Sequence, residues 1–385
     1  MKIAYVYPQF ARLAGTERVL IDKMNYLADQ EGMEVMMVTY EQGTHPYAYP
    51  LSPKVKHVDL DVRFYSLYQH NAIVRYYKWL QYSKLLKRRF NQLMADEKPD
   101  IVIATTYHGN ILTMIDDCPT HFIKVLESHI DKRFVHNNDP ENQRRLTTWL
   151  RSIYDMKVLN CKARKFDVLV AIHAKDAEEW SHFLKTQTIS NIVHLNETGR
   201  YCNFESKRVI FVGRLNYQKG LPDLIRIWKI VHERHSDWHL DMYGDGDIQI
   251  IPATAEERSQ MNIHVHGADS AIFNHYLESS IFVLTSIYES FGLVMPEAMS
   301  CGLPVVAFDC PSGPANIITD GVDGYLIKGR DVNLFADKLC QLIASPDLRR
   351  SMGNAAIQSS QRYSADRIMA QWMSLFKELL KPSQL

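Results

Sequence analysis

Short apolar segments alternate with longer amphipathic segments along most of this 385-residue chain. An apolar run of about five residues between turn-forming residues is typical of a buried strand, and apolar residues three or four positions apart are typical of a helix. The pattern predicts strands at 3–7, 34–39, 101–104, 122–126 and 168–172, with helical stretches between them. This alternation favours an α/β fold with a parallel sheet.

A second series of the same kind follows a polar, non-periodic connection, NETGRYCNFE, at 196–205. Strands are predicted at 209–212, 281–285 and 305–308, and strand–turn patterns occur in LDMYGDGD, IHVHG and DGYLI. The chain closes with a predicted helix at 365–380, with Ile368, Trp372, Leu375 and Leu379 on one face. We therefore expect two α/β domains, residues 1–196 and 205–363, followed by a terminal segment, 364–385.

Composition agrees with two domains, because 385 residues exceed one ordinary hydrophobic core. The 44 basic and 44 acidic residues cancel, so the overall charge gives no argument for binding nucleic acid. Six cysteines are dispersed without a CxxC pair, which favours buried thiols in a reducing compartment. No apolar segment is long enough for a signal peptide or a membrane span, so we expect a cytoplasmic protein.

The run SIYESFGLVMPEAMSCGLPVVAF, residues 286–308, contains the most informative pattern. It predicts a polar loop after a strand, then a short helix that ends at Gly302. The backbone N–H groups of Phe291, Gly292 and Leu293 would lie at the start of that helix, which favours an anion such as a diphosphate. Glu297, inside the helix, would accept ribose hydroxyls, and Glu289 would accept hydroxyls of the group that the phosphates carry. Alternatively, both are solvated glutamates near a helix start, where acids are common.

The segment RVIFVGRLNYQKGLPDLIRIWKIVHE, residues 208–233, predicts a strand, a turn and an amphipathic helix. Arg214 and Lys219 would lie at the carboxyl end of the strand, where open α/β sheets bind ligands. Two cations there would hold a diphosphate and offset the charge that develops as it leaves. The alternative is an ordinary solvated loop, which the presence of the glutamate segment makes a weaker interpretation.

Three segments together, GRLNYQKG, YESFGLVMPEAMSCGLPVV and GPANIITDGVDGYLI, resemble family 4 glycosyltransferases. The resemblance is specific over about residues 205–330 and organisational over the first 200. It implies the GT-B fold, with two Rossmann-like domains facing a cleft and a carboxyl-terminal helix that packs back on the first domain. It also implies a nucleotide-sugar donor, retention of anomeric configuration, and no metal or other cofactor.

The resemblance assigns roles residue by residue. Arg214 and Lys219 match the diphosphate contacts and Glu297 the ribose contact, whereas Glu289, Phe291, Gly292 and Leu293 match the donor-sugar contacts. In AGTERV, Gly15 matches the family's glycine-rich loop, although Ala14 replaces a usual glycine. Asn316 stands where a glutamate is frequent, and no role is assigned to it.

The catalytic group is expected in the first domain, after the strand that ends at Glu127. His129 matches a family histidine that contacts the donor sugar near the reacting carbon, and it could hydrogen-bond a sugar hydroxyl or steady the transition state. The predicted catalytic set is therefore His129, Glu289, Arg214 and Lys219. His108, after another strand, is a second choice. Without the resemblance, both histidines would be interpreted as ordinary packing or surface residues.

Two Asp-x-Asp pairs, Asp59 with Asp61 and Asp245 with Asp247, raise the question of a metal site. The pattern is short and is expected by chance in a chain of this length. We interpret both pairs as structural, so the expected metal site is none.

Between residues 63 and 95 the chain carries seven cations and no acid, interleaved with eight Phe, Tyr and Trp residues. Such a segment could lie on an anionic membrane or face a lipid-diphosphate acceptor. Alternatively, its aromatics pack on the first domain and its cations are solvated. The acceptor-side candidates are Arg75, Lys78 and Trp79, together with His108.

The sequence thus predicts a retaining glycosyltransferase that moves a sugar from a UDP-sugar to a glycan or lipid-linked glycan in surface polysaccharide or lipopolysaccharide synthesis. It would work in the cytoplasm, with peripheral contact on the inner face of the membrane. Two alternatives remain: a GT-B-fold UDP-sugar epimerase, which needs no acceptor, and a nucleotide-sugar-binding protein without turnover.

Overall fold

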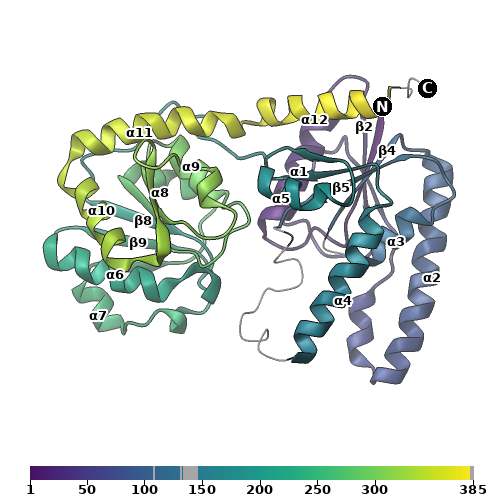
Figure 1. Cartoon of the computed structure of the whole chain (residues 1–385), viewed down its shortest axis with the longest axis horizontal. Helices are drawn as coiled ribbons and strands as arrows, with labels where there is room; N and C mark the ends of the chain where they lie inside the picture. Colours follow the sequence, from purple (N-terminus) through teal and green to yellow (C-terminus); the bar gives the residue numbers. More distant parts are fainter. Residues whose placement is uncertain (107–108, 131, 133–145, 382–385) are drawn as a thin grey trace. The chain divides into compact units, whose positions relative to one another are not determined.

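The computed structural model describes residues 1–106, 109–130, 132 and 146–381. The chain divides into two compact units, unit 1 with residues 1–192 and 368–385, and unit 2 with residues 193–367. Each unit is built on a parallel sheet with helices on both of its faces (Figure 1). The predicted fold class, two Rossmann-like α/β units, is confirmed.

The boundaries between the units differ by a few residues from those expected at 196 and 363. Val193 already belongs to unit 2, because its backbone N–H donates to the carbonyl of Tyr363. The N–H of Asn196 likewise donates to the hydroxyl of Ser300, at 2.9 Å. The polar connection predicted at 196–205 is therefore part of unit 2.

The sheet of unit 1 has the strand order β3-β2-β1-β4-β5-β6-β7. Its strands are β1 (Lys2–Val6), β2 (Glu34–Thr39), β3 (Lys56–Asp59), β4 (Ile101–Thr105), β5 (Ile123–Ser128), β6 (Val168–Ala171) and β7 (Thr186–Thr188). The five strands predicted from the sequence are present to within two residues. The edge strands β3 and β7 were missed because they are short, polar and partly exposed, so they carry no apolar run.

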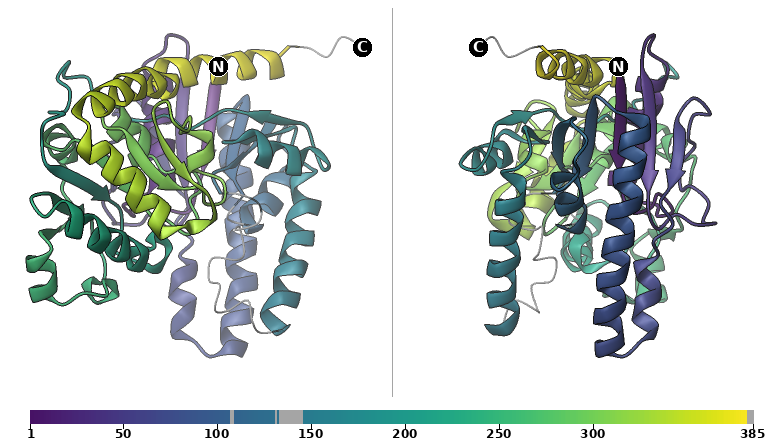
Figure 2. Two further views of the ribbon diagram at one scale, coloured as in Figure 1. Left: turned by 60° about the vertical axis from the view of Figure 1, so that its left-hand side comes forward. Right: turned by 90° about the vertical axis from the view of Figure 1, so that its right-hand side faces the viewer.

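Helices connect these strands and cover the sheet on both sides (Figures 1 and 2). They are α1 (Gly15–Ala28), the 3-10 helix η1 (Phe64–Gln69), α2 (Ala72–Glu97), α3 (Gly109–Asp116), α4 (Leu146–Ala163), α5 (Ala174–Ser181) and α12 (Ala365–Leu379). Helix α12 buries Ile368, Met369, Trp372, Leu375 and Phe376, whose helical spacing gives one apolar face. Most of α12 belongs to unit 1, although the chain has passed through unit 2 before reaching it.

The sheet of unit 2 has the strand order β10-β9-β8-β11-β12-β13. Its strands are β8 (Arg208–Val212), β9 (His239–Tyr243), β10 (Ile263–His266), β11 (Ile281–Leu284), β12 (Val305–Phe308) and β13 (Gly324–Ile327). Its α-helices are α6 (Leu221–Arg234), α7 (Ala255–Gln260), α8 (Ile272–Glu278), α9 (Val294–Ser300), α10 (Val332–Ala344) and α11 (Pro346–Ser360). The 3-10 helices are η4 (Tyr217–Lys219), η5 (Ile248–Ile250), η6 (Pro314–Asn316), η7 (Lys328–Arg330) and η8 (Gln361–Tyr363).

Both sheets reverse their strand order at the same topological position. In unit 1 the chain builds outward from β1 to β3 and then returns to place β4 on the other side of β1. In unit 2 it does the same from β8, with β11 on the other side. Ligands of open α/β sheets bind outside the carboxyl ends of the two strands at such a switch point. The loops after β1 and β4, and after β8 and β11, are therefore where a site is expected.

Candidate functional site

The loops after β8 and β11 are joined directly to each other in unit 2. The hydroxyl of Thr285 donates to the carbonyl of Lys219 at 2.9 Å, and the N–H of Ile287 donates to that of Gln218 at 2.7 Å. Gly220, with φ of 63°, lies so close to β11 that a Cβ atom would stand 2.1 Å from the carbonyl oxygen of Thr285. Only glycine fits there, so the sequence YQKG is what allows the two loops to meet.

Lys219 and Glu289 form an ion pair across these two loops. Their Nζ and Oε2 atoms are 2.5 Å apart, and each side chain is only 12% exposed. The hydroxyl of Ser286 donates to the same carboxylate oxygen at 3.2 Å. The Lys219 side chain runs over Gly213, where a Cβ would lie 3.1 Å from its Cε atom. Two residues predicted to contact different parts of one ligand are thus brought together and oriented by each other.

The segment from Phe291 to Leu293 leads directly into α9. Gly292 adopts φ of 86°, a left-handed conformation that favours glycine, and a Cβ there would lie 3.0 Å from Cγ of Glu289. Phe291 is buried and meets the ring of Tyr363 edge-on at 5.3 Å. Leu293 is the N-cap residue of α9, and its apolar side chain cannot accept the first N–H groups of that helix. The three residues lie as the sequence predicted, at the start of the helix.

Glu297 lies in the first turn of α9 and is only 2% exposed. The hydroxyl of Tyr276, on α8, donates to its Oε2 atom at 3.5 Å. A buried carboxylate needs polar partners, because losing its water is costly. The alternative of two solvated glutamates near a helix start therefore does not describe Glu289 and Glu297.

Arg214 differs from Lys219 although both follow β8. Its side chain is exposed, and in the described part of the chain its guanidinium forms no ion pair. The buried side chain of Leu215 anchors the loop just after it. Arg214 is thus a cation at the carboxyl edge of the sheet that is available for an anionic group.

Arg330, on η7, supports this region, although it was not predicted as a site residue. It donates to the carbonyl oxygens of Ser286 at 2.8 Å and Thr285 at 3.0 Å, and it also pairs with Asp223 of α6. These bonds hold the loop after β11 against the helix that follows the loop after β8. No local sequence signal reveals this role, since Arg330 lies more than forty residues from the loop it supports.

In unit 1, Gly15 begins α1 directly beyond the loop after β1. Ala14, the N-cap residue, has φ of −140°, an extended conformation that any residue adopts, so the alanine at this position introduces no strain. Glu17, in the first turn, is buried and accepts a hydrogen bond from the hydroxyl of Tyr7 at 3.3 Å. Burial raises the pKa of Glu17, although the Tyr7 hydroxyl and the charges of Arg12 and His129 oppose this.

A buried polar cluster joins β5 to α1 in the same unit. Nε2 of His129 lies 2.7 Å from Oε2 of Glu127, and Nζ of Lys23, on α1, contacts the same oxygen. All three side chains are at most 3% exposed. Burial alone would raise the pKa of Glu127, but the charge of Lys23 and the His129 hydrogen bond outweigh it and lower the pKa. His129 was predicted, whereas the part of Lys23 was missed because α1 and β5 are a hundred residues apart.

Unpaired polar atoms surround this cluster at the carboxyl ends of β4 and β5. Within the described residues, Oε1 of Glu127, Nδ1 of His129 and the hydroxyl oxygens of Thr105 and Thr106 are buried without a hydrogen-bond partner. Such atoms are rare in folded proteins and mark places where a ligand or water completes the bonding. His108 lies outside the described residues.

The acceptor-side candidates lie on the first turns of α2. Arg75 and Trp79 are exposed, and both line a cavity of about 900 Å³ formed entirely within unit 1. Lys78 instead contacts Nε2 of His70 at 2.8 Å and does not line that cavity. Several aromatic side chains of the segment are exposed, including Tyr65, Tyr68, Tyr76 and Tyr77.

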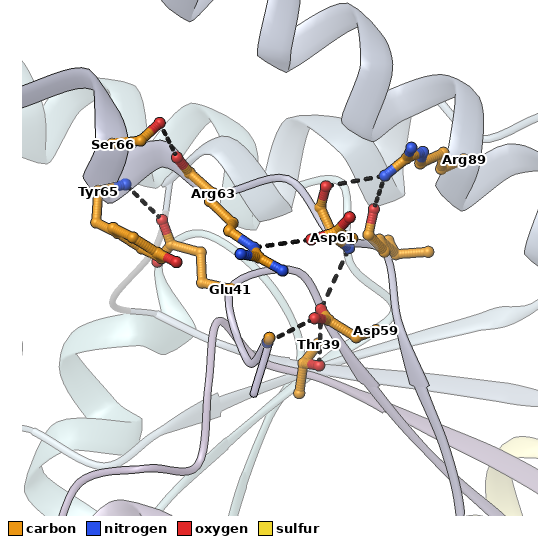
Figure 3. Close-up of polar contacts among 10 residues, drawn as sticks. Thr39, Glu41, Asp59, Asp61, Arg63, Tyr65, Ser66 and Arg89 are labelled. Atoms are coloured by element: carbon orange, nitrogen blue, oxygen red, sulfur yellow. Dashed lines mark hydrogen bonds and ion pairs between the residues drawn. The ribbon is translucent and has the colours of Figure 1, made fainter. Parts of the chain in front are cut away.

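The aspartates of the two Asp-x-Asp pairs have structural partners. Asp59 accepts from the N–H of Gly43 at 2.7 Å, and Asp61 pairs with Arg63 at 2.8 Å (Figure 3). Asp245 accepts from the N–H of Ala268, and Asp247 from that of Gln249. Among the described residues, no three His, Cys, Asp or Glu side chains are grouped so that they could hold a metal ion.

Comparison with known proteins gives a family match in unit 2. Residues 203–359 match the family described as Glycosyl transferases group 1. The amylovoran biosynthesis glycosyltransferase AmsD of Erwinia amylovora is 35% identical over 189 residues, which cover 48% of this chain and 53% of that protein. An uncharacterized glycosyltransferase of Haemophilus influenzae is 24% identical over 381 residues, which cover 97% and 99%. The chain thus spans about half the length of the first of these relatives.

Among solved structures, a mutant of S. aureus TarM, in complex with Fondaparinux, alpha-GlcNAc-glycerol and UDP, superposes with a TM-score of 0.73. It is 16% identical and the match covers 97% of this chain and 99% of that one. At this identity the likeness concerns the fold, and it confirms the predicted GT-B architecture. At the level of the domain, the family match confirms the predicted enzyme class, that of the glycosyltransferases.

Proposed function

We propose that this chain, whose residues 203–359 carry a Glycosyl transferases group 1 domain, transfers a sugar from a nucleotide-sugar to a glycan or lipid-linked glycan with retention of configuration. The proposed donor is a UDP-sugar, and the TarM structure, which contains UDP, supports that choice. The proposed product belongs to a surface polysaccharide or lipopolysaccharide, which the name of the amylovoran relative supports. The proposed assignment is to family 4 of the glycosyltransferases.

The observation that carries this proposal is the pair of joined loops at the switch point of unit 2. They combine an exposed arginine, a lysine–glutamate ion pair and a helix start with a glycine in the left-handed conformation. Arg214 and the N–H groups of residues 291–293 suit a diphosphate. Glu297 suits ribose hydroxyls, and Glu289 suits hydroxyls of the donor sugar.

The proposed reaction is a substitution on one face of the sugar. The acceptor oxygen forms a bond to the anomeric carbon as the bond from that carbon to the diphosphate oxygen breaks on the same side. The acceptor proton passes to the departing diphosphate, and the nucleoside diphosphate leaves. Arg214 and Lys219 stabilise the negative charge that develops on this leaving group. His129 hydrogen-bonds the donor sugar near the reacting carbon.

A double displacement would instead need a carboxylate beneath the anomeric carbon, as in retaining glycosidases. Glu289 is the carboxylate nearest that role, but it is engaged by Lys219 and Ser286. We therefore assign Glu289 to sugar binding during a single substitution. We also propose that Arg214 and Lys219 stabilise the leaving group in place of a metal ion, so that turnover continues when a chelator is present.

The proposed location is the cytoplasmic face of an anionic membrane. None of the helices in the described ranges is long and apolar enough to cross a bilayer. Helix α2 presents Lys84, Lys87 and Arg88 around one surface hollow, and such a basic face suits anionic lipids. Lys87 also pairs with Asp117 at 2.8 Å, which leaves Lys84 and Arg88 as the main contacts.

Calorimetric titration of UDP, GDP and ADP into the wild type and Glu297→Ala tests the donor site. We expect UDP to bind most tightly of the three nucleotides. The substitution should lower the affinity for UDP by about tenfold or more, because the ribose would lose charge-assisted hydrogen bonds. Glu256→Ala, which removes an exposed glutamate from α7, is the matched control and should bind UDP normally. Each variant must keep the wild-type unfolding transition.

Incubation with several UDP-sugars then tests turnover. Slow release of UDP, with a preference for one sugar, is expected of a transferase that uses water in the absence of its acceptor. Interconversion of UDP-sugars without UDP release would point to an epimerase. If a correctly folded wild type binds none of the three nucleotides, the proposed function is wrong.

A further inference from the structure

A cavity of about 900 Å³ lies within unit 1, and its described lining residues do not include those of the polar cluster around His129. Its floor comes from the loop after β1, with Gln9 and Arg12, and from Tyr40 and Glu41 directly after β2. Its walls come from η1 and the first turns of α2, which lie side by side in both views (Figures 1 and 2). The cavity therefore opens at the carboxyl edge of the sheet, beside the loop that leads to Gly15.

The walls of this cavity are mainly aromatic. Tyr40, which is buried, and Phe64, which is partly buried, meet edge-on at 6.0 Å and form its inner part. Nearer to solvent, Tyr65, Tyr76 and Trp79 are 43%, 60% and 37% exposed. Exposed aromatic side chains gathered around a hollow are typical of a binding site, because their faces stack on flat or ring-shaped ligands. Sugar rings present such faces through their C–H groups.

Polar contacts hold the cavity in shape. Arg89 of α2 donates to the carbonyl oxygens of Leu60 and Asp61, at 2.5 and 2.8 Å, and so ties the helix to the segment before η1 (Figure 3). The N–H of Tyr65 donates to Glu41 at 3.2 Å, which ties η1 to the end of β2. These bonds connect both walls to the sheet, so the site is formed before a ligand arrives.

Two arginines give the cavity its polarity. Arg12 and Arg75 both line it and both are exposed, and neither forms a salt bridge in the described part of the chain. Glu41 also lines it, but its carboxylate already accepts the Tyr65 N–H, and the charge of Arg12 acts on it. Guanidinium groups bind phosphate and carboxylate groups through two parallel hydrogen bonds. The cavity therefore offers stacking surfaces together with cations for an anion.

We propose that this cavity is the acceptor subsite, and that it takes a saccharide carrying a phosphate or carboxylate group. The proposal rests on the transferase function proposed above and specifies the chemistry of its acceptor. The sugar ring lies against Tyr76 and Trp79, and the anionic group pairs with Arg75 and Arg12. A soluble sugar phosphate, a uronic acid and the headgroup of a lipid-linked sugar share this chemistry.

Direct titration of the 385-residue chain tests the anion requirement. The probes are glucose 1-phosphate, glucuronic acid, unmodified glucose and inorganic phosphate. Saturation-transfer NMR and calorimetry measure the binding of each probe. We expect the two anionic sugars to bind at least tenfold more tightly than glucose or phosphate alone, since each lacks one half of the recognition. Equal binding of glucose and the anionic sugars would overturn the proposal. A difference between the phosphate and the carboxylate identifies the acceptor's anionic group.

Two pairs of matched variants localise the binding. Arg75→Ala and Lys175→Ala each remove one exposed cation from a helix of unit 1, α2 and α5 respectively, but only Arg75 lines the cavity. Tyr76→Ala and Tyr77→Ala remove neighbouring rings of similar exposure, 60% and 64%, and only Tyr76 lines the cavity. We expect Arg75→Ala and Tyr76→Ala to lower the affinity for glucose 1-phosphate by about tenfold. The two control variants should leave that affinity unchanged.

Vesicles with and without phosphatidylglycerol separate this site from a membrane surface. If all four variants lose vesicle binding alike and no sugar binds, the cavity is part of a lipid contact and the proposal is wrong. UDP titration into the same variants separates the two proposals. If the wild type binds UDP but no anionic sugar, only the acceptor subsite is contradicted. If the wild type binds anionic sugars but not UDP, only the donor site is contradicted.

Discussion

A single carboxylate oxygen of Glu127 contacts both the imidazole of His129, at 2.7 Å, and the ammonium group of Lys23. An ionised carboxylate can only accept, so Nε2 of His129 must carry a proton in this contact. In a neutral imidazole, Nδ1 is then the acceptor nitrogen, and it is buried without a partner among the described residues. Glu127 thus orients His129 and fixes its tautomer, and we regard Glu127 and Lys23 as positioning residues.

We predict that Glu127→Gln destabilises the protein by about 3–5 kcal/mol, because it leaves the buried charge of Lys23 without a counterion. The substitution keeps the size and the accepting oxygen, so it isolates the charge. Urea unfolding measures the loss. Lys23→Met combined with Glu127→Gln should recover much of it, since both charges are then removed. A double variant as unstable as the sum of the two single variants would contradict this account.

Glu17 gives a prediction about pH. Burial raises its pKa, so the folded state binds its proton more readily than the unfolded chain does. Its contribution to stability is therefore full below the unfolded pKa of a glutamate, about 4.3, and is lost as the pH rises through the folded value. We expect Glu17→Gln, which keeps an acceptor for Tyr7, to be more stable than the wild type at pH 8. The two should have equal stability near pH 4.

Melting temperatures measured from pH 4 to 8 test this. Glu31→Gln, at an exposed position just after α1, is the control and should show no pH-dependent gain. A Glu17→Gln variant that is less stable than the wild type at pH 8 would show that an unrecognised partner stabilises the carboxylate.

Trp372 links the carboxyl-terminal helix to the buried cluster. Nζ of Lys23 lies 4.3 Å from the centre of the Trp372 ring, so the aromatic face supplies part of its environment. We predict that Trp372→Ala costs about 3–5 kcal/mol through the cavity it leaves. Trp372→Phe should cost clearly less, because a ring remains above the ammonium group. Urea unfolding of both variants tests the contact. Equal losses of unfolding free energy in the two variants would contradict it.

The sequence predicted most of the fold because the central strands are short apolar runs buried on both faces. Ile101 to Ala104 and Val305 to Phe308 are examples, and their residues leave little choice of structure. The edge strands β3 and β7 were missed, since neither of them has such a run. A local motif can be recognised in the sequence, whereas the position of an element in the folded sheet cannot.

The same distinction applies to the candidate site. Arg214, Lys219, Glu289 and Glu297 belong to two local motifs, so their patterns could be recognised in the sequence. The ion pair between Lys219 and Glu289 could not, because it depends on how closely Gly220 allows the loops after β8 and β11 to approach. Lys23 and Arg330 were missed for a related reason: each acts on residues that are distant in the sequence.

Substitutions at Gly292 and Gly321 can distinguish the effect of backbone strain from the effect of a changed donor-site geometry. The φ of Gly292 is 86°, and a Cβ would lie 2.6 Å from Cε of Met295 and 3.0 Å from Cγ of Glu289. Gly321 has a similar φ of 75°, with nothing within 4 Å of its Cβ position, and is a matched control. Gly321→Ala should cost about 1–2 kcal/mol of left-handed strain in urea unfolding, and Gly292→Ala should cost more, because Met295 and Glu289 must also shift.

Only Gly292→Ala should also displace the carboxylate of Glu289 and narrow the approach to the backbone N–H groups beside it. We therefore expect UDP-sugar affinity to fall by about tenfold or more in Gly292→Ala and to stay unchanged in Gly321→Ala. Calorimetry on both variants, with UDP as well as the UDP-sugar, measures the difference. A larger loss for the UDP-sugar than for UDP would place Glu289 at the sugar, since the nucleotide alone does not reach that carboxylate. Equal affinities in the two variants would mean that the donor does not approach Gly292.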